Sequence, residues 1–255
     1  MKINIDNIDV NYIVEGVDSN YTILLLHGWG VEIETYRVLI DELKKNFKVY
    51  AIDFPGFGKT PNPPETYTVL DYAKLTLEFI NRLGLENVVL IGHSFGGRVI
   101  VKMVSKLGYS PKKIILIDSA GVKPKRKFGY HVKTLIYKVV KTASRLVLGK
   151  KKSQEFITKY RNKRGSADYL AADETMKNVF KNVVNEDLVT HFKDVTMPTL
   201  LIWGELDMDT PLSDAKIMEK EMKDAGLVVI KGAGHFSFLN NLNQVVIVIN
   251  KFLER

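Results

Sequence analysis

The stretch Val88–Gly97 reads Val-Val-Leu-Ile-Gly-His-Ser-Phe-Gly-Gly and decides the fold. Its first four residues are apolar without a polar interruption, which predicts a buried parallel strand. The next residues fit the pattern G-x-S-x-G around Ser94, and apolar residues then recur at helical spacing as far as Leu107. A strand that passes through one residue into a helix needs a sharp turn, which exposes the Ser94 hydroxyl above the sheet. The pattern alone also fits an ordinary glycine-rich turn, so the rest of the chain must distinguish the two interpretations.

Length and composition favour one large soluble domain or a core with an insert. The chain has 255 residues, of which 45% are hydrophobic, and it contains no cysteine. Without cysteine, disulfides and thiolate metal sites are excluded, and we expect neither a metal nor a cofactor. No apolar run reaches the roughly 18 residues of a transmembrane helix. The segment Met1–Asp6 also lacks the apolar core of a signal peptide, so we expect a cytoplasmic protein.

Strands and helices alternate along most of the chain, which predicts an α/β fold with a mostly parallel, eight-stranded sheet and helices on both faces. Besides the strand before Ser94, the pattern predicts strands over Lys2–Ile5, Ile8–Val14, Thr22–Leu26, Lys48–Ile52, Lys113–Ile117, Thr199–Trp203 and Leu227–Ile230. Besides the helix after Ser94, it predicts helices over Thr35–Lys45, Val69–Leu83, Pro211–Ala225 and Asn243–Leu253.

The alternation stops after Gly121, and residues 122–190 contain helical patterns without a strand-like run. We therefore expect a core of residues 1–121 and 191–255, with residues 122–190 forming a helical cap inserted into it. Open α/β sheets bind ligands at the carboxyl ends of their strands, and the insert follows one of these ends. The cap is thus expected to cover the site.

The positive charge of the protein is concentrated in this insert. The whole chain carries a net charge of +8, whereas residues 122–164 contain fifteen Lys or Arg and one acid, a net charge of +14. The predicted basic helix from Gly129 to Leu148 has an apolar stripe, which favours packing over the site. Peripheral contact with an anionic membrane is the less favoured interpretation. No nucleic-acid-reading motif accompanies the charge, so nucleic acid is not expected as a partner.

Two further residues fall where a serine nucleophile would need them. A serine hydroxyl needs a base to take its proton, and His235 follows the final strand in Gly232–Phe236. The acid that orients such a base is expected on another loop after a strand, and Asp207 follows Thr199–Trp203. The order Ser94, Asp207, His235 is the order of the α/β-hydrolase triad.

With these residues the chain resembles the α/β-hydrolase family, specifically its capped, esterase-like members. The resemblance covers nearly the whole chain and rests on His27–Gly30, Asp53–Gly58, Gly92–Gly97, Trp203–Asp207 and Gly234–Phe236. It implies that Ser94 attacks a carbonyl, that His235 shuttles the proton and that Asp207 fixes the His235 tautomer. It also implies an oxyanion hole made by the backbone N–H groups of Trp29 and Phe95. Dehalogenases of this family use an aspartate nucleophile, and the serine here argues against that chemistry.

Several neighbouring residues allow alternative assignments. Asp118 also follows a predicted strand and is the rival of Asp207 as the orienting acid, while Asp209 is a local substitute. We favour Asp207. His93, beside the nucleophile, is interpreted as a packed, hydrogen-bonded support rather than a second base. His27 is interpreted as a structural residue of the oxyanion loop.

Three functions fit these residues. The favoured one is hydrolysis of a small-molecule carboxylic ester, with an apolar acyl group, through an acyl-enzyme. The second is C–C bond hydrolysis on the same scaffold, which Phe236 after His235 makes less favoured, because such relatives often have Trp there. The third is a receptor-like ligand-binding protein with low turnover. The sequence determines neither the acyl and alcohol groups nor the oligomeric state.

Overall fold

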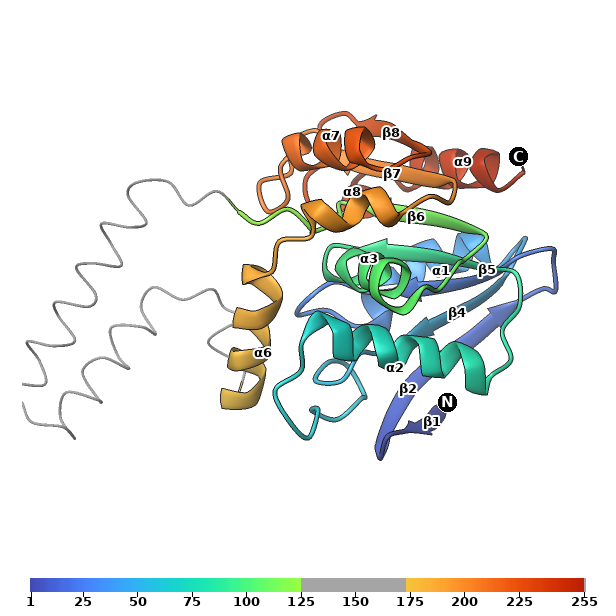
Figure 1. Ribbon diagram of the computed structural model, residues 1–255. Helices are drawn as coiled ribbons and strands as arrows, with labels where there is room; N and C mark the ends of the chain where they lie inside the picture. The colour runs from blue at the N-terminus through green and yellow to red at the C-terminus, as the bar shows by residue number, and fades with distance from the viewer. Residues whose placement is uncertain (125–172, 255) are drawn as a thin grey trace, which may run out of the picture.

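The computed structural model of the protein describes residues 1–124 and 173–254. Within these residues the chain forms one eight-stranded sheet in the order β1-β2-β4-β3-β5-β6-β7-β8 (Figure 1). The strands are β1 (Lys2–Ile5), β2 (Ile8–Gly16), β3 (Thr22–Leu26), β4 (Lys48–Ile52), β5 (Val88–His93), β6 (Lys113–Ile117), β7 (Thr199–Gly204) and β8 (Ala225–Ile230). Strand β2 pairs antiparallel with β1 and β4, and all other neighbours are parallel. The predicted fold class is therefore confirmed.

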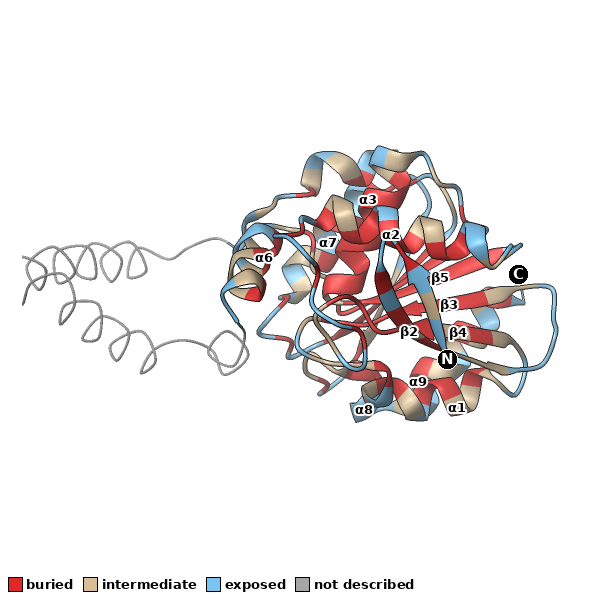
Figure 2. Ribbon diagram, turned by 90° about the horizontal axis from the view of Figure 1, so that it is seen from below, coloured by how far each residue is buried: buried red, intermediate tan, exposed pale blue. Residues whose placement is uncertain are grey.

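The central strands are buried on both faces because helices cover each side of the sheet (Figure 2). Alternate residues of a strand point to opposite faces, so Leu24 and Leu26 of β3 join one core cluster while Ile23 and Leu25 join the other. The first cluster includes residues of α2 (Val69–Arg82), α3 (Phe95–Leu107), α6 (Glu174–Asn185), η2 (Val189–Asp194) and α7 (Leu212–Glu221). The second includes residues of η1 (Ile33–Tyr36), α1 (Arg37–Leu43), α8 (Ser237–Asn240) and α9 (Leu242–Leu253).

Helix α6 lies wholly within the described part of the predicted cap, and it packs on the core through one apolar face. Met176, Val179 and Val183 are buried, and the Asp173 carboxylate caps the helix by accepting the Met176 N–H at 2.8 Å. The predicted helix 129–148 lies outside the described residues, so the cap as a whole stays a prediction. No helix in the described ranges has the length and apolarity needed to cross a membrane.

Several predicted helices are too long. The helix expected over Thr35–Lys45 is observed as α1, which runs from Arg37 to Leu43 after the short 3-10 helix η1, and the helix expected over Val69–Leu83 ends at Arg82. The helix expected over Pro211–Ala225 ends at Glu221, because Met222 adopts an extended conformation with φ −80° and ψ 144°. Ala225 and Gly226 instead begin β8, where they pair with Thr199 and Leu200 of β7. Hydrogen bonding to the sheet edge thus overrides the local helical pattern.

Candidate active site

Ser94 occupies a strained turn between strand β5 and helix α3. It has φ +48° and ψ −109°, a region that residues with a Cβ avoid at a cost of about 1–3 kcal/mol. The turn is tight enough that a Cβ built on Gly96 would lie 2.1 Å from the Leu26 carbonyl oxygen. A Cβ on Gly92 would lie 2.6 Å from Ile100 Cδ1. The two glycines of G-x-S-x-G are therefore required by the close approach of strand and helix, as the sequence predicts.

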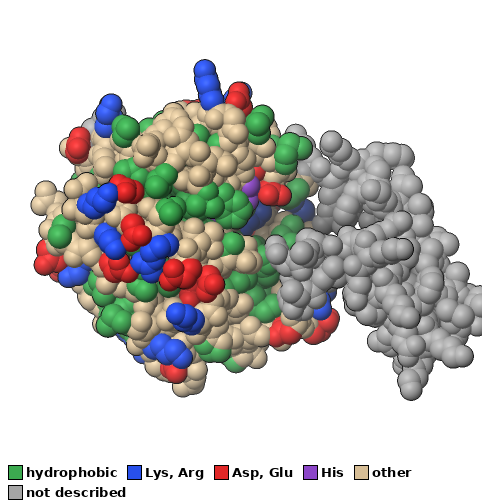
Figure 3. Space-filling view, turned by 180° about the vertical axis from the view of Figure 1, so that it is seen from behind, with side chains coloured by type: hydrophobic (Ala, Val, Ile, Leu, Met, Phe, Trp, Pro, Cys, Tyr) green, Lys and Arg blue, Asp and Glu red, His purple; other side chains and the backbone are tan. Residues whose placement is uncertain are grey.

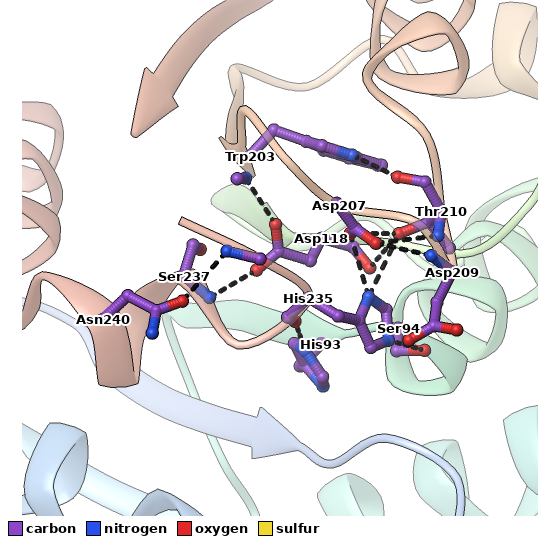
Figure 4. A network of polar contacts seen from close by, with 12 residues as sticks. His93, Ser94, Asp118, Trp203, Asp207, Asp209, Thr210, His235, Ser237 and Asn240 are labelled. Carbon is purple, nitrogen blue, oxygen red and sulfur yellow. Dashed lines mark hydrogen bonds and ion pairs between the residues drawn. The ribbon is translucent and has the colours of Figure 1, made fainter. Parts of the chain in front are cut away.

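The side chains of Ser94, His235 and Asp207 form one hydrogen-bonded row (Figure 4). Ser94 Oγ lies 3.1 Å from His235 Nε2, and His235 Nδ1 lies 2.9 Å from Asp207 Oδ2. Each residue comes from a different loop, after β5, β8 and β7 respectively, at the shared carboxyl edge of the parallel strands. The structure thus brings the three predicted residues together, while their catalytic roles stay a prediction.

The Asp207 carboxylate accepts three further hydrogen bonds from its own loop. Its Oδ1 accepts the backbone N–H of Asp209 at 2.8 Å and of Thr210 at 3.0 Å, and its Oδ2 accepts the Thr210 hydroxyl at 2.7 Å. Thr210 is itself fixed, because Trp203 Nε1 donates to its carbonyl at 2.7 Å. Burial raises the pKa of Asp207, but the hydrogen bonds from His235 and Thr210 outweigh this and hold the pKa below 3.8. Asp207 is therefore ionised at neutral pH.

The pKa of His235 moves in the direction that an ionised partner requires. Burial by itself lowers the pKa of His235, while the hydrogen bond and charge of Asp207 raise it by more, so the pKa lies above 6.5. The opposite shifts of the two partners agree with each other, as expected for a carboxylate that stabilises an imidazolium. This environment makes His235 a stronger proton acceptor than an exposed histidine.

Asp118, the rival acid, is used differently. Its Oδ1 accepts the Gly204 N–H at 2.7 Å and its Oδ2 accepts the Ser237 N–H at 2.9 Å. Among the described hydrogen bonds, none joins the Asp118 carboxylate to the His235 ring. Burial raises the pKa of Asp118 to about 6. Asp118 therefore ties the end of β7 to the loop after His235, and the geometry favours Asp207 as the partner of the imidazole.

His93 connects two loops of the site. Its Nε2 lies 2.8 Å from the His235 carbonyl oxygen, which can only accept, so Nε2 carries the proton and donates. Its Nδ1 therefore accepts the Tyr36 hydroxyl at 2.8 Å, and that hydroxyl oxygen accepts the Gly28 N–H at 2.9 Å. Burial lowers the pKa of His93 to about 3, so its ring stays neutral. Through these contacts His93 supports the loops of Gly28 and His235. Both of its ring nitrogens are engaged, so neither is free to act as a second base.

His27 shapes the loop that carries the predicted oxyanion hole. Its Nε2 accepts the Phe54 N–H at 2.8 Å, so its Nδ1 carries the proton and donates to the Gly28 carbonyl at 2.6 Å. Burial lowers the pKa of His27 to about 4, which keeps this tautomer neutral. The arrangement matches the structural role expected from the sequence.

The backbone N–H groups of Trp29 and Phe95 are available as donors. Neither makes a hydrogen bond to any residue in the ranges 1–124 and 173–254. The Gly28 backbone passes close to the nucleophile, since a Cβ built there would lie 3.4 Å from Ser94 Cβ. Two unused donors beside Ser94 are the arrangement that a tetrahedral oxyanion needs, and their assignment to an oxyanion hole remains a prediction.

A cavity of about 950 Å³ opens beside Ser94 and His235. Most of its wall is apolar, with Trp29, Phe95, Val122, Phe180, Val183, Val184, Met208, Ile217 and Phe236 contributing. The Trp29 indole packs against Phe180 of α6 with ring centroids 5.1 Å apart. In Figure 3 a histidine side chain is visible at the opening of a recess, between charged and hydrophobic side chains. The cavity is large enough for a small organic substrate.

Asp207, Asp209 and His235 also offer three ligand atoms within 4.8 Å of one another. The Asp207 oxygens and His235 Nδ1 are already engaged in the hydrogen bonds described above. Two of the three residues therefore already use these atoms in hydrogen bonds with protein groups.

The chain belongs to the α/β-hydrolase family, whose model matches residues 23–246. A pimeloyl-[acyl-carrier protein] methyl ester esterase of Legionella pneumophila is 26% identical over 244 residues, covering 91% of this chain and 95% of that protein. The structure of an esterase from Exiguobacterium antarcticum is similar with a TM-score of 0.76 and 20% identity, over 100% of this chain and 98% of that chain. An enol-lactonase from Burkholderia xenovorans is similar with a TM-score of 0.77 and 16% identity, over 100% of both chains.

Proposed function

We propose that the protein hydrolyses carboxylic esters through an acyl-enzyme intermediate. The observation that carries the proposal is the hydrogen-bonded row of Ser94, His235 and Asp207 at the wall of an apolar cavity. Relatives whose names state ester or lactone hydrolysis add support at the level of reaction class.

In the proposed mechanism, Ser94 Oγ attacks the ester carbonyl while His235 Nε2 accepts its proton. The charge that develops on the carbonyl oxygen is stabilised by the N–H groups of Trp29 and Phe95. His235 then donates the proton to the departing alcohol, which leaves the acyl group on Ser94. A water molecule, deprotonated by the same imidazole, releases the acid. Asp207 keeps the Nδ1 proton of His235 in place and stabilises the imidazolium in both half-reactions.

The lining of the cavity supports an apolar acyl group in a small-molecule substrate. The aromatic and aliphatic walls around Trp29, Phe180 and Ile217 favour burial of such a group at about 25 cal/mol per Å². We further propose that residues 122–190 form a cap over this cavity and that the protein acts in the cytoplasm. Residues 125–172, with most of the basic charge, lie outside the described part of the chain.

The first test is a pre-steady-state measurement with an activated 4-nitrophenyl ester. We expect a burst of nitrophenol close to one equivalent of enzyme, because acylation of Ser94 precedes the slower release of the acid. Cleavage of a vinylogous diketone without ester turnover would instead support a C–C bond hydrolase. Tight ligand binding with negligible turnover would support a receptor-like protein, and either result would overturn the proposal.

The pH dependence of the reaction tests the base. His235 accepts a proton only in its neutral form, and its pKa lies above 6.5, so kcat/KM should rise with pH and reach half its maximum above pH 6.5. A pH series with a neutral ester measures this midpoint. A flat profile between about pH 5 and 8 would contradict a histidine base.

A further inference from the structure

Arg98 places a positive charge in the wall of the apolar cavity. It lies four residues after Ser94 at the start of helix α3, so the two residues share one face of the chain at this turn. The Arg98 side chain is only 3% exposed, and it lines the same cavity as Ser94 and His235. No step of the ester hydrolysis described above uses it.

The protein satisfies little of the hydrogen-bonding capacity of Arg98. Nη1 donates to the Glu186 carbonyl oxygen at 2.7 Å, and this is the one hydrogen bond that Arg98 makes within residues 1–124 and 173–254. A guanidinium has five N–H donors. Nε and Nη2 of Arg98 have no hydrogen-bond partner among the described residues, but neither atom is fully buried. Both therefore keep contact with solvent. Arg98 is also a lining residue of the cavity that holds Ser94 and His235.

Arg98 also lacks a carboxylate partner. Glu186, whose carbonyl Arg98 binds, directs its carboxylate to Lys102 Nζ at 2.7 Å, and no described acid forms an ion pair with Arg98 within 4.0 Å. Burial lowers the pKa of Arg98 to about 10, so the guanidinium is still charged at neutral pH. The carboxylates of Glu186, Asp187 and Asp214 favour this charge from beyond ion-pair distance, and a carboxylate that enters the cavity would give it a direct partner.

We propose that Arg98 is an anion-binding subsite that selects esters carrying a carboxylate at the end remote from the scissile bond. The planar guanidinium binds a carboxylate through two parallel N–H bonds, and the apolar wall accommodates the chain between the carboxylate and the ester. The substrate class is thus half-esters of dicarboxylic acids or esters of similar shape. This inference rests on the proposed ester hydrolysis and adds the specificity of the same site.

The test compares the monomethyl ester of a dicarboxylic acid with the neutral dimethyl ester, over a series of chain lengths. In R98Q, kcat/KM for the best monoanionic ester should fall by about 10- to 100-fold, the value of one charge-assisted hydrogen-bond pair. The neutral ester should change by less than about 3-fold, since Arg98 does not touch the reacting atoms. Lys106, exposed on the same helix, gives the matched control, because K106Q removes the same charge outside the cavity and should preserve the discrimination.

Binding without turnover provides a second readout. Calorimetry in the S94A background should show tighter binding of the monoanionic ester with Arg98 than with Gln at this position. An equal loss for both esters in R98Q, with equal binding, would make Arg98 a structural anchor for Glu186 and overturn the proposal. If R98Q does not fold, R98K decides, because it keeps the charge but loses the two-pronged geometry, and unchanged discrimination there would also overturn it. Wild-type protein that hydrolyses neither ester but binds the monoanion through Arg98 would reject the esterase function alone.

Discussion

Replacing Ser94 by alanine should abolish almost all ester turnover while leaving the fold intact. The loss should approach a million-fold in kcat, the size seen when a serine protease loses its nucleophile. The reason is that His235 Nε2 would have no hydroxyl within its 3.1 Å reach, and the acyl-enzyme could not form. Alanine keeps the Cβ and removes only the hydroxyl, so the fold should be preserved. Steady-state rates with a 4-nitrophenyl ester measure the effect.

Ser213 provides the matched control for this variant, because it is an exposed serine that lines the same cavity. Its hydroxyl contacts only the Asp214 carboxylate among the hydrogen bonds described for it, at 3.3 Å, and no base activates it. S213A should therefore change turnover little, and a fluorophosphonate should label Ser94 and not Ser213. Labelling at Ser213, or an active S94A enzyme, would refute Ser94 as the nucleophile.

The second large effect is expected at Asp207. Asp207→Asn should lower kcat by roughly 10⁴-fold, because an amide in place of the carboxylate sets the wrong His235 tautomer. The midpoint of the pH profile should also move to lower pH, since the charge of Asp207 raises the pKa of His235. Both quantities come from one pH series on the purified variant.

Two neighbouring acids test the specificity of this result. Asp209→Asn removes an adjacent charge but keeps the backbone N–H that Asp207 accepts, so its loss should be far smaller. Asp118→Asn should mainly lower thermal stability, because its carboxylate accepts two backbone N–H groups and an amide can accept only one of them. A crippled Asp118 variant with full stability, beside a mild Asp207 variant, would reverse the assignment of the acid.

The sequence predicts the sheet well because its central strands are short, mostly apolar runs bounded by turn residues. The strands at Thr22–Leu26, Lys48–Ile52 and Lys113–Ile117 have the predicted limits, and so has helix α3 at Phe95–Leu107. The limits were wrong where tertiary pairing decides them, as at Ala225, where β7 recruits residues that carry a helical pattern. The short helix Ser237–Asn240 was not predicted, because four residues are too few to show a period.

Some residues of the candidate site could be predicted from the sequence and others could not. Ser94, Asp207 and His235 could be predicted because each follows a strand, and parallel strands bring these positions to one edge. Tyr36 and Arg98 could not be predicted as parts of the site. Tyr36 contacts His93, 57 residues further along the chain, and Arg98 contacts Glu186, 88 residues further along. Such contacts arise from packing and leave no periodic signal in the sequence.

The backbone conformation of Ser94 lowers the stability of the fold, while the proposed function needs the serine hydroxyl at this position. Glycine has no Cβ and would relieve about 1–3 kcal/mol of strain at φ +48°. The greater freedom of glycine in the unfolded chain would offset only about 0.5–1 kcal/mol of that gain. Laboratory evolution for heat resistance alone should therefore drift toward glycine at this turn and discard the hydroxyl. A stabilised derivative of this protein must be selected for turnover and for melting temperature together.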